Sequence, residues 1–428
     1  MSRFLFVLFE GGGNVPAQLG IARRLAGRGH AVAVLGDPTL APAARAAGCD
    51  HVAFPTAPVH DLRSRDSDAI RDWLPGSPIA RLARTARTLM FGPAEAYARD
   101  VLSTAERWRP DAIAVDYMLF GALIGAERSG LPTAAIVHTI YPLPAAGVPP
   151  FGLGLAPARG PLGRLRDAVL RRAVARTFDR LGRPAINAAR AALGLPLLAS
   201  VFDQVQRSDR ILVLTTASFD FAARARLPAV VVFTGPELDD PSWTRAWQSP
   251  WPRHAAQPLV VVALGSTFQD QLGAIQRAVD ALATLPVRGL VTLGEVFDPG
   301  ELRLPPNVVA LRSAPHRQVL PEARAVISHA GHGTLLKALA HGVPVLAIPL
   351  GRDQADNAAR LVETGAGLHL GPRASPRRIA RGVTRILGEP AFLASARRIA
   401  ADIARDVAVD RATCELEALA ARHPHNTD

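Results

Sequence analysis

A glycine-rich turn between a predicted strand and a predicted helix most constrains how this chain folds. Residues 325–328 form a short apolar run typical of a buried strand, and residues 334–341 have the composition of a helix. Small residues and two histidines lie between them. Glycine lets the backbone approach a ligand closely, and the first N–H groups of a helix have no partner within it. Together with the helix dipole, these N–H groups predict a site for a phosphate or diphosphate.

Polar residues around this turn distinguish it from an ordinary strand-to-helix turn, which is what a glycine turn alone usually is. The imidazole of His329 ends the strand, and the hydroxyl of Thr334 begins the helix. The next predicted strand, 343–349, is followed by Asp353 and Gln354. Because parallel strands end at one sheet edge, these groups are expected to lie near each other. They suit a hydroxyl-rich ligand such as a sugar.

Three sequence blocks in this region resemble a known donor-binding signature. They are HAGHGT at 329–334, AHGVP at 340–344 and GRDQADNA at 351–358. The blocks resemble the signature of family-1 glycosyltransferases with the GT-B fold, and in particular the bacterial antibiotic and macrolide branch. Their fixed order makes the resemblance more specific than a lone glycine motif. It implies transfer of a sugar from a nucleotide-diphosphate donor.

The alternation of predicted strands and helices indicates an α/β chain with two doubly wound, Rossmann-like domains that face a central cleft. A chain of 428 residues exceeds one ordinary domain. We predict an acceptor-binding domain over 1–235, a Pro- and Trp-rich linker over 236–257, and a nucleotide-sugar-binding domain over 258–428. The resemblance implies that the final helices cross back onto the first domain.

Composition argues against several other classes of protein. The formal charge is +12, but aromatic residues make up only 5% and the arginines are dispersed, so nucleic-acid binding is not predicted. The two cysteines, Cys49 and Cys414, are far apart and form no disulfide scaffold or CxxC metal site. No apolar run is long enough to cross a bilayer, and the run 4–9 is too short for a signal peptide. We expect a cytoplasmic protein without stable membrane insertion.

A basic amphipathic helix is predicted over 165–181. Its apolar stripe consists of Leu165, Val169, Ala173, Thr177 and Leu181, and its other face carries Arg164, Arg171 and Arg172. Such a helix can touch a membrane surface or cap an acceptor site. A merely solvated polar face is the more common situation.

The resemblance implies roles for residues of the second half. The positions that hold the diphosphate are Ser266, His329, Gly331, Gly333 and Thr334. Asp353 and Gln354 match the pair that bonds the sugar hydroxyls. The nucleotide sugar, with UDP or dTDP as the nucleotide, is a co-substrate, and neither a separate cofactor nor a metal is predicted.

Two donor positions depart from the family pattern. Ser313 stands where many members have a tryptophan that stacks on the nucleobase. Lys337, the only lysine, stands where a glutamate often bonds the ribose. A lysine can instead reach a phosphate, so we predict that Lys337 faces the donor cleft.

The catalytic base also departs from the family pattern. Asp116 matches an aspartate that orients the family's histidine, but the histidine position itself falls on Gly13, which cannot act as a base. The remaining candidates near the same sheet edge are Glu10, Asp116 and His138. Because Glu10 and Asp116 end strands of the same sheet, we predict that they lie on one edge, where repulsion and desolvation raise the pKa of one of them, and that this carboxylate replaces the missing histidine as the base. His138 is the candidate if neither carboxylate acts.

The sequence therefore predicts an inverting glycosyltransferase that acts on an apolar natural product. The alternative is a GT-B-fold protein without glycosyl transfer, either an accessory or ligand-binding protein or an enzyme of another reaction type on a polyketide- or terpenoid-like substrate. The sequence leaves a homodimer open.

Overall fold

The computed structural model describes residues 1–240, 244, 246–252 and 255–422. Its first half builds a parallel sheet of seven strands in the order β3-β2-β1-β4-β5-β6-β7. The strands are β1 (Arg3–Leu8), β2 (Ala31–Gly36), β3 (Asp50–Ala53), β4 (Ala112–Asp116), β5 (Thr133–Val137), β6 (Arg210–Val213) and β7 (Val231–Phe233). Because β1 is buried at every position after Arg3, it needs the continuous apolar run that the sequence has there.

The second half builds a parallel sheet of six strands in the order β10-β9-β8-β11-β12-β13. The strands are β8 (Leu259–Ala263), β9 (Arg288–Thr292), β10 (Val308–Leu311), β11 (Ala323–Ser328), β12 (Val345–Ala347) and β13 (Gly367–His369). In each sheet the strand order reverses once, between β1 and β4 and between β8 and β11. Ligands of open α/β sheets bind at such switch points.

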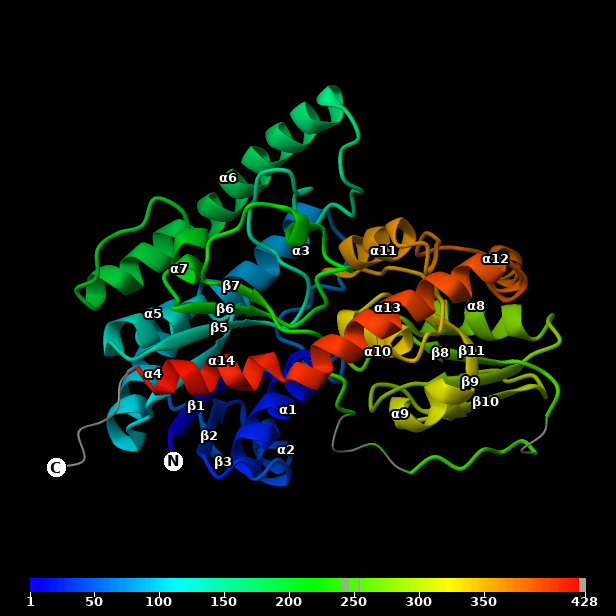
Figure 1. Cartoon of the computed structure of the whole chain (residues 1–428), viewed down its shortest axis with the longest axis horizontal. Helices are drawn as coiled ribbons and strands as arrows, with labels where there is room; N and C mark the ends of the chain where they lie inside the picture. The colour runs from blue at the N-terminus through cyan, green and yellow to red at the C-terminus, as the bar shows by residue number, and fades with distance from the viewer. Residues whose placement is uncertain (241–243, 245, 253–254, 423–428) are drawn as a thin grey trace.

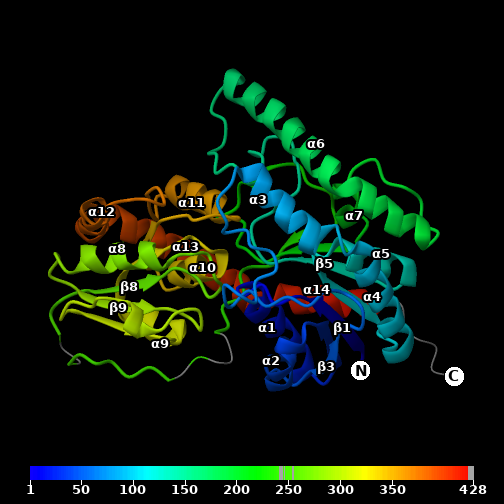
Figure 2. The same cartoon turned by 180° about the vertical axis from the view of Figure 1, so that it is seen from behind.

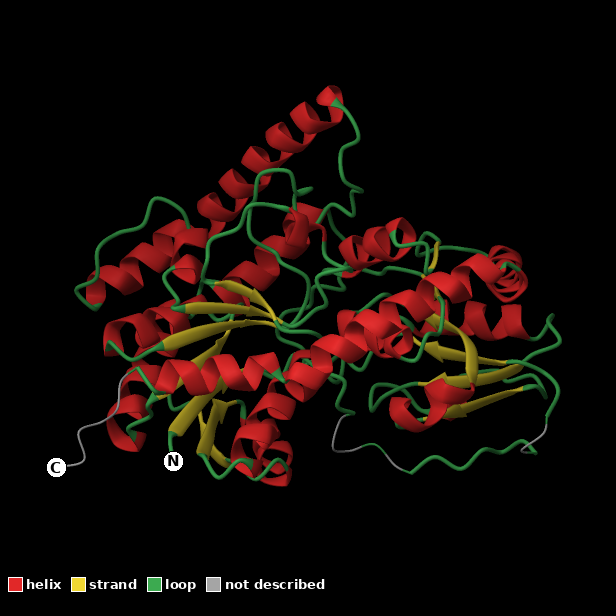
Figure 3. Cartoon of the chain, viewed as in Figure 1, coloured by secondary structure: helices red, strands yellow, loops and turns green. Residues whose placement is uncertain are grey.

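Helices pack on both faces of each sheet (Figure 3). Around the first sheet they are α1 (Asn14–Gly27), α2 (Ala41–Ala46), α3 (Pro78–Thr85), α4 (Ala94–Trp108), α5 (Phe120–Ser129), α6 (Pro161–Ala192) and α7 (Phe202–Gln206). Those that follow are α8 (Leu272–Leu282), α9 (His316–Val319), α10 (His332–Ala340), α11 (Gln354–Glu363), α12 (Pro376–Gly388), α13 (Pro390–Val409) and α14 (Arg411–Ala420). Single-turn segments lie at Pro38–Leu40, Ala86–Met90, Phe221–Arg224, Pro299–Glu301 and Leu320–Glu322.

Alternate residues of the central strands enter two separate cores. Leu5 and Val7 of β1 pack with residues of α4 and α5, whereas Phe4 and Phe6 pack with residues of α1 on the other face. The residues of β8 divide in the same way between two cores of the second sheet. A sheet that buries both faces in this way is a doubly wound α/β sheet.

The last helices cross from the second sheet to the first. Asp410 lies between α13 and α14 with a left-handed φ of 49° and redirects the chain. The next helix adds Leu416 and Leu419 to the core that also holds Phe4 and Phe6. In Figure 1 the red path of α13 and α14 runs from one sheet to the other.

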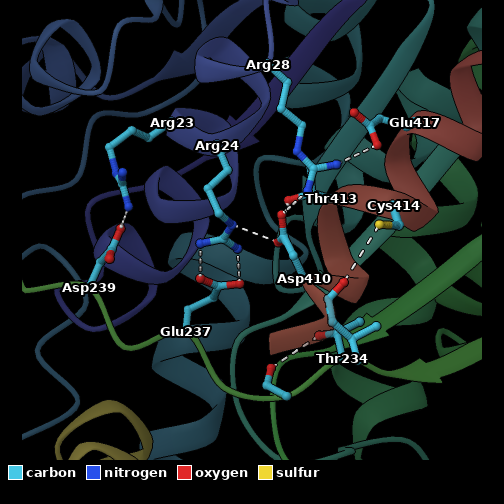
Figure 4. A network of polar contacts seen from close by, with 12 residues as sticks. Arg23, Arg24, Arg28, Thr234, Glu237, Asp239, Asp410, Thr413, Cys414 and Glu417 are labelled. Carbon is cyan, nitrogen blue, oxygen red and sulfur yellow. Dashed lines mark hydrogen bonds and ion pairs between the residues drawn. The ribbon is translucent and has the colours of Figure 1, made fainter. Parts of the chain in front are cut away.

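Ion pairs join α1, the segment after β7 and this C-terminal crossing (Figure 4). Arg24 donates to both oxygens of Glu237, at 2.8 and 2.5 Å, and to Asp410 at 2.8 Å. Arg23 reaches Asp239 at 2.8 Å. Three stretches that are far apart in sequence therefore meet at one cationic helix.

The helix predicted over 165–181 is present and extends over Pro161–Ala192. The N-terminal part of its apolar stripe faces solvent, since Leu165 and Val169 are 62% and 54% exposed. The helix instead packs through residues such as Phe178, which contacts other aromatic rings.

The domain division at 235 and 258 stays a prediction about folding units. The two sheets occupy 3–233 and 259–369. Residues 241–243, 245 and 253–254 of the predicted linker lie outside the described residues.

Candidate active site

The two sheets meet where their strands end. The turn after β1 approaches the turn after β8 so closely that a Cβ added at Gly12 would lie 2.5 Å from Thr267 Cγ2 and 3.1 Å from Ser266 Oγ. Phe268 N–H donates to the Leu62 carbonyl at 2.8 Å across the same boundary. The predicted base candidates and the predicted donor residues thus lie on facing sheet edges.

A histidine and an aspartate from neighbouring strands form a pair on the first edge. Asp116 ends β4, and His138 follows the last residue of β5; these strands are adjacent in the sheet. His138 Nδ1 lies 3.2 Å from Asp116 Oδ2, an ion-pair distance, although the alignment falls short of a good hydrogen bond. Asp116 is fully buried, whereas the His138 side chain is 16% exposed. An imidazole held by a buried carboxylate is the usual arrangement of a general base.

Side chains from the first turn of α1 hold Asp116 in its charged form. Asn14 Nδ2 and Gln18 Nε2 donate to Asp116 Oδ2 at 2.9 and 2.7 Å, and Met118 N–H donates to Oδ1 at 3.0 Å. Burial raises the pKa of Asp116, but His138 and these donors outweigh burial, so its pKa is below the ordinary value.

The carboxylate raises the proton affinity of its partner. Burial lowers the pKa of His138, but the Asp116 charge more than offsets this, with a smaller contribution from Asp353, and the net pKa of His138 is raised. A base with a raised pKa holds its proton more firmly once it has taken it from a substrate.

Glu10 lies in a different electrostatic environment. Burial raises its pKa to about 7, although Gly12 N–H donates to its carboxylate at 3.1 Å. The charges that act on it are those of Arg63, Asp61 and Asp37, not that of Asp116. The predicted rise of one carboxylate pKa by desolvation is confirmed for Glu10, but the predicted repulsion from Asp116 was wrong, because Asp116 is not among the charges that act on Glu10 and His138 lowers the pKa of Asp116.

Gly13 has free space around it. It is the residue before the first turn of α1, with an ordinary helical φ of −68°, and an added Cβ would meet no heavy atom within 4 Å. The backbone here therefore accepts a side chain, and no packing constraint explains the glycine.

On the facing edge, the glycine turn and the start of α10 form the predicted anion site. Gly331 is the N-cap residue of α10, no side chain caps the helix, and no acidic residue lies in its first turn, which contains Gly333 and Thr334. A Cβ at Gly331 would lie 2.4 Å from His329 Nε2, so the imidazole packs directly under the turn and only glycine fits above it. Burial lowers the pKa of His329 to about 4, so the imidazole is neutral. Its Nδ1 has no hydrogen-bond partner among the described residues.

Asp353 connects the two edges. Thr139, the residue after His138, donates its hydroxyl to Asp353 Oδ2 at 2.6 Å. Asn357 Nδ2 donates both to the same Asp353 oxygen, at 2.9 Å, and to the carbonyl of Ala330, at 3.0 Å. Ala330 has a left-handed φ of 66°, which is uncommon for a residue other than glycine. Asn357 thus braces both the predicted sugar-binding carboxylate and the predicted anion turn.

Gln354 and Lys337 have local partners. Gln354 Oε1 accepts from the N–H groups of Leu350 and Gly351, at 2.7 and 3.0 Å, so this amide shapes the turn that presents Asp353. Lys337 is 8% exposed, and its ammonium donates to Asp240 at 3.0 Å. Burial lowers the pKa of Lys337 against the opposing charge of Asp240. The Lys337 side chain avoids bulk solvent, as expected, but its charge is already neutralised by Asp240, which lies in the segment between the two sheets.

A small apolar pocket of about 20 Å³ lies next to the first edge. Its walls are the loop at 141–151 and the inner face of α6, which contributes Arg171, Val174 and Phe178. No group of three or more potential metal ligands occurs in the described part of the chain. None of the helices described is long and apolar enough to span a membrane.

Comparisons with known proteins agree with this geometry. Residues 276–419 match the family described as erythromycin biosynthesis protein CIII-like, C-terminal domain. The chain is 31% identical to 4'-demethylrebeccamycin synthase of Lentzea aerocolonigenes, over 96% of this chain and 97% of that protein. It is 28% identical to the TDP-daunosamine transferase DnrS of Streptomyces peucetius, over 76% and 71% of the two chains. The crystal structure of CalG4, the calicheamicin glycosyltransferase, is similar with a TM-score of 0.76 and 24% identity over 99% and 100% of the chains.

The chain belongs to the antibiotic-biosynthesis glycosyltransferases of family 1. The predicted fold class is confirmed, because two parallel α/β sheets and the similarity to CalG4 identify the GT-B fold. The glycosyltransferase activity expected from the sequence is confirmed at the level of the family. The roles of single residues stay predictions.

This glycosyltransferase has site residues that the sequence did not single out. Asn14 and Gln18 were not expected to contact Asp116, although their spacing of four places them on one helix face. Arg352, within the GRDQ block, donates to Thr267 Oγ1 at 2.8 Å and to both oxygens of Asp72, at 2.7 and 3.2 Å, so it joins the turn after β8 to the first half of the chain. His332 Nε2 contacts the Leu214 carbonyl at 3.0 Å across the sheets. The sequence signal for His332 was its place as the second histidine of the HAGHGT block.

Proposed function

We propose that this glycosyltransferase moves a sugar from a dTDP- or UDP-sugar to an apolar natural product, with His138 as the general base and Asp116 as the residue that orients it. The observation that carries the proposal is the His138–Asp116 pair on the edge that faces the start of α10. This pair supplies both a base and the carboxylate that orients it, so the mechanism does not need a histidine at position 13.

The reaction follows from these positions. Nδ1 of His138 faces Asp116, so Nε2 is the nitrogen that takes the proton from the acceptor hydroxyl or amine. The acceptor atom forms a bond to the anomeric carbon of the sugar as the bond from that carbon to the diphosphate oxygen breaks. The bonding electrons leave with the diphosphate. Attack from the face opposite the leaving group inverts the anomeric carbon.

The second edge supplies the groups that a leaving diphosphate needs. The free N–H groups of α10, the hydroxyls of Ser266 and Thr334, and a proton of His329 are all donors. Arg352 lies close to Ser266 through Thr267, but it is paired with Asp72 at 2.7 Å, so much of its charge is already balanced. Donors already in place before the reaction stabilise the charge that develops on the leaving group. Asp353 would accept hydrogen bonds from the sugar hydroxyls.

The relatives support the substrate classes. The name of DnrS describes a TDP-sugar donor, and the name of 4'-demethylrebeccamycin synthase describes an antibiotic product. We also propose that the protein works in the cytoplasm, where nucleotide sugars are made.

The donor site is tested by calorimetry with dTDP and UDP. We expect His329→Ala to weaken nucleotide-diphosphate binding by about 1.5–3 kcal/mol, the scale of a hydrogen bond to a charged group. The matched control is His369→Ala, a histidine exposed at the end of β13. If both variants bind as the wild type does, the diphosphate does not occupy this turn. Donor binding without transfer to any acceptor in a broad panel would instead favour a protein without glycosyl transfer.

A further inference from the structure

The outer face of α6 exposes large apolar side chains along its N-terminal half. Leu162, Leu165 and Val169 are 82%, 62% and 54% exposed. Their spacing of three and four residues places them on one side of the helix, and Ala173 continues the row. Isolated exposed leucines are normal on protein surfaces, but an ordered row on one helix face indicates a binding surface.

Arginines flank this row on the same face. Arg166, Arg172, Arg176 and Arg180 are exposed and lie at helical spacing with the apolar row. Of the two acidic residues of α6, Asp167 is buried and pairs with Arg166, and Asp179 accepts from Ser200 and Val201, so neither neutralises Arg172, Arg176 or Arg180. Within the described residues, only Arg166 of these four arginines has an acidic partner, its neighbour Asp167. We call Leu162, Leu165, Arg166, Val169, Arg172, Ala173, Arg176 and Arg180 the outer face of α6.

The opposite side of the same helix makes its contacts with the rest of the protein. Phe178 contacts Phe91 and Phe202, and it lines the apolar pocket together with Arg171 and Val174. The outer face is therefore not needed to hold the helix in place. The N-terminal half of α6 projects beyond the rest of the molecule in both views (Figures 1 and 2), so a large flat partner can reach it.

We propose that the outer face of α6 docks onto an anionic lipid bilayer, with the helix lying in the plane of the interface. Leucine and valine side chains would enter the boundary between headgroups and acyl chains, and the arginines would lie among negatively charged headgroups. Arginine suits this position because its stem can lie along apolar groups while its charge stays near water. The long basic row fits an extended negative surface.

A second copy of this chain is a poorer occupant for the outer face. In a two-fold dimer the same patch would meet itself, and arginines without acidic partners would face arginines. The charge of the face therefore argues for a negatively charged partner.

The test is cosedimentation of the full chain with vesicles of phosphatidylcholine, with and without phosphatidylglycerol. We expect binding only to the vesicles that contain phosphatidylglycerol, and weaker binding at high salt. Substituting Leu162→Gln, Leu165→Gln and Val169→Gln together should lower the partition coefficient by at least about tenfold. Because these side chains are exposed, the melting temperature should not change.

A charge-matched control separates docking from general attraction. We expect vesicle binding to be abolished by the triple variant Arg172→Ser, Arg176→Ser and Arg180→Ser. The control removes the same charge from α12 through Arg377→Ser, Arg378→Ser and Arg381→Ser, and it should keep most of the vesicle binding. Equal loss in both arginine variants, or full binding by the glutamine variant, overturns the proposal. The proposal is also overturned if sedimentation without vesicles shows a dimer of the wild type that the glutamine variant does not form, because the outer face of α6 would then bind a second copy. Vesicle binding is measured without a donor, so a failure of the proposed function leaves it unaffected.

Discussion

Single residues at the strand ends determine the chemistry of this glycosyltransferase. The sequence placed Asp116 and His138 near one sheet edge because each follows a buried strand. It could not pair them, because their separation depends on the adjacency of β4 and β5 and on side-chain direction. It also could not show that Lys337 and Asp240 form a pair, because Asp240 lies in a segment without periodicity.

The pH dependence of turnover tests the role of Asp116. A base must be unprotonated to act, and the pKa of His138 is raised above 6.5, so kcat/KM of the wild type should rise with pH through a pKa above 6.5. Asp116→Asn removes the charge that raises this pKa. The rising limb should therefore move to lower pH, and the plateau should fall by roughly 10²-fold or more. If the rising limb of the Asp116→Asn profile has the same apparent pKa as that of the wild type, a group other than His138 is titrating.

Lys337→Glu tests the buried ion pair. The substitution restores the residue expected from the family but places a carboxylate beside Asp240. We expect a loss of about 3–5 kcal/mol in the free energy of unfolding, because one buried charge loses its partner and meets a like charge. Denaturant titration measures it, and Lys337→Glu combined with Asp240→Lys should recover part of the loss. An unchanged midpoint for Lys337→Glu would mean that the pair contributes nothing.

At the scale of elements, the strands, the glycine turns and the helix over 165–181 were predictable, but the face through which that helix packs was not. Continuous apolar runs specify buried parallel strands, and glycines mark the turns between strands and helices. The stripe of α6 followed helical periodicity but faces solvent, because periodicity gives one face of a helix without showing what covers it. The packing face became visible only with the partners of Phe178.

The turn between β1 and α1 offers a rescue experiment. Gly13 has room for a side chain and an ordinary helical φ, so Gly13→His should fold with a stability within about 0.5 kcal/mol of the wild type. Because the resemblance implies a catalytic histidine at this position, we expect Gly13→His to restore at least about tenfold of the turnover lost in His138→Gln. Gly13→Gln in the same background is the control. Equal rates in the two double variants would contradict a shared role for positions 13 and 138.

At the scale of the whole molecule, two sheets and a crossing pair of helices enclose the site. Alternation and length predicted two α/β sheets, and the resemblance implied the return of the C-terminal helices. The contacts that hold the parts together were not predictable, because Arg24, Glu237 and Asp410 are far apart in sequence and stand in no motif. The short distances between these three side chains arise only when the chain has folded.

Arg24 is expected to stabilise this assembly. The Glu237 side chain is only 9% exposed, and Arg24→Ala would leave it and Asp410 without their shared partner. We expect a loss of about 3 kcal/mol in the free energy of unfolding, measured by denaturant titration. Arg23→Ala, at the more exposed pair with Asp239, should cost less than about 1 kcal/mol. Similar costs for the two variants would show that Arg24 does not join the three segments.

The most direct test of the central claim is the turnover of His138→Gln, with donor binding measured separately by calorimetry. Glutamine keeps a polar side chain of similar reach but cannot take the acceptor proton. The account predicts that kcat falls by about 10²–10⁴-fold while dTDP binding is unchanged, and that Glu10→Gln keeps most of its activity. Full turnover by His138→Gln, or a comparable loss in Glu10→Gln with donor binding intact, would contradict the assignment of His138 as the base.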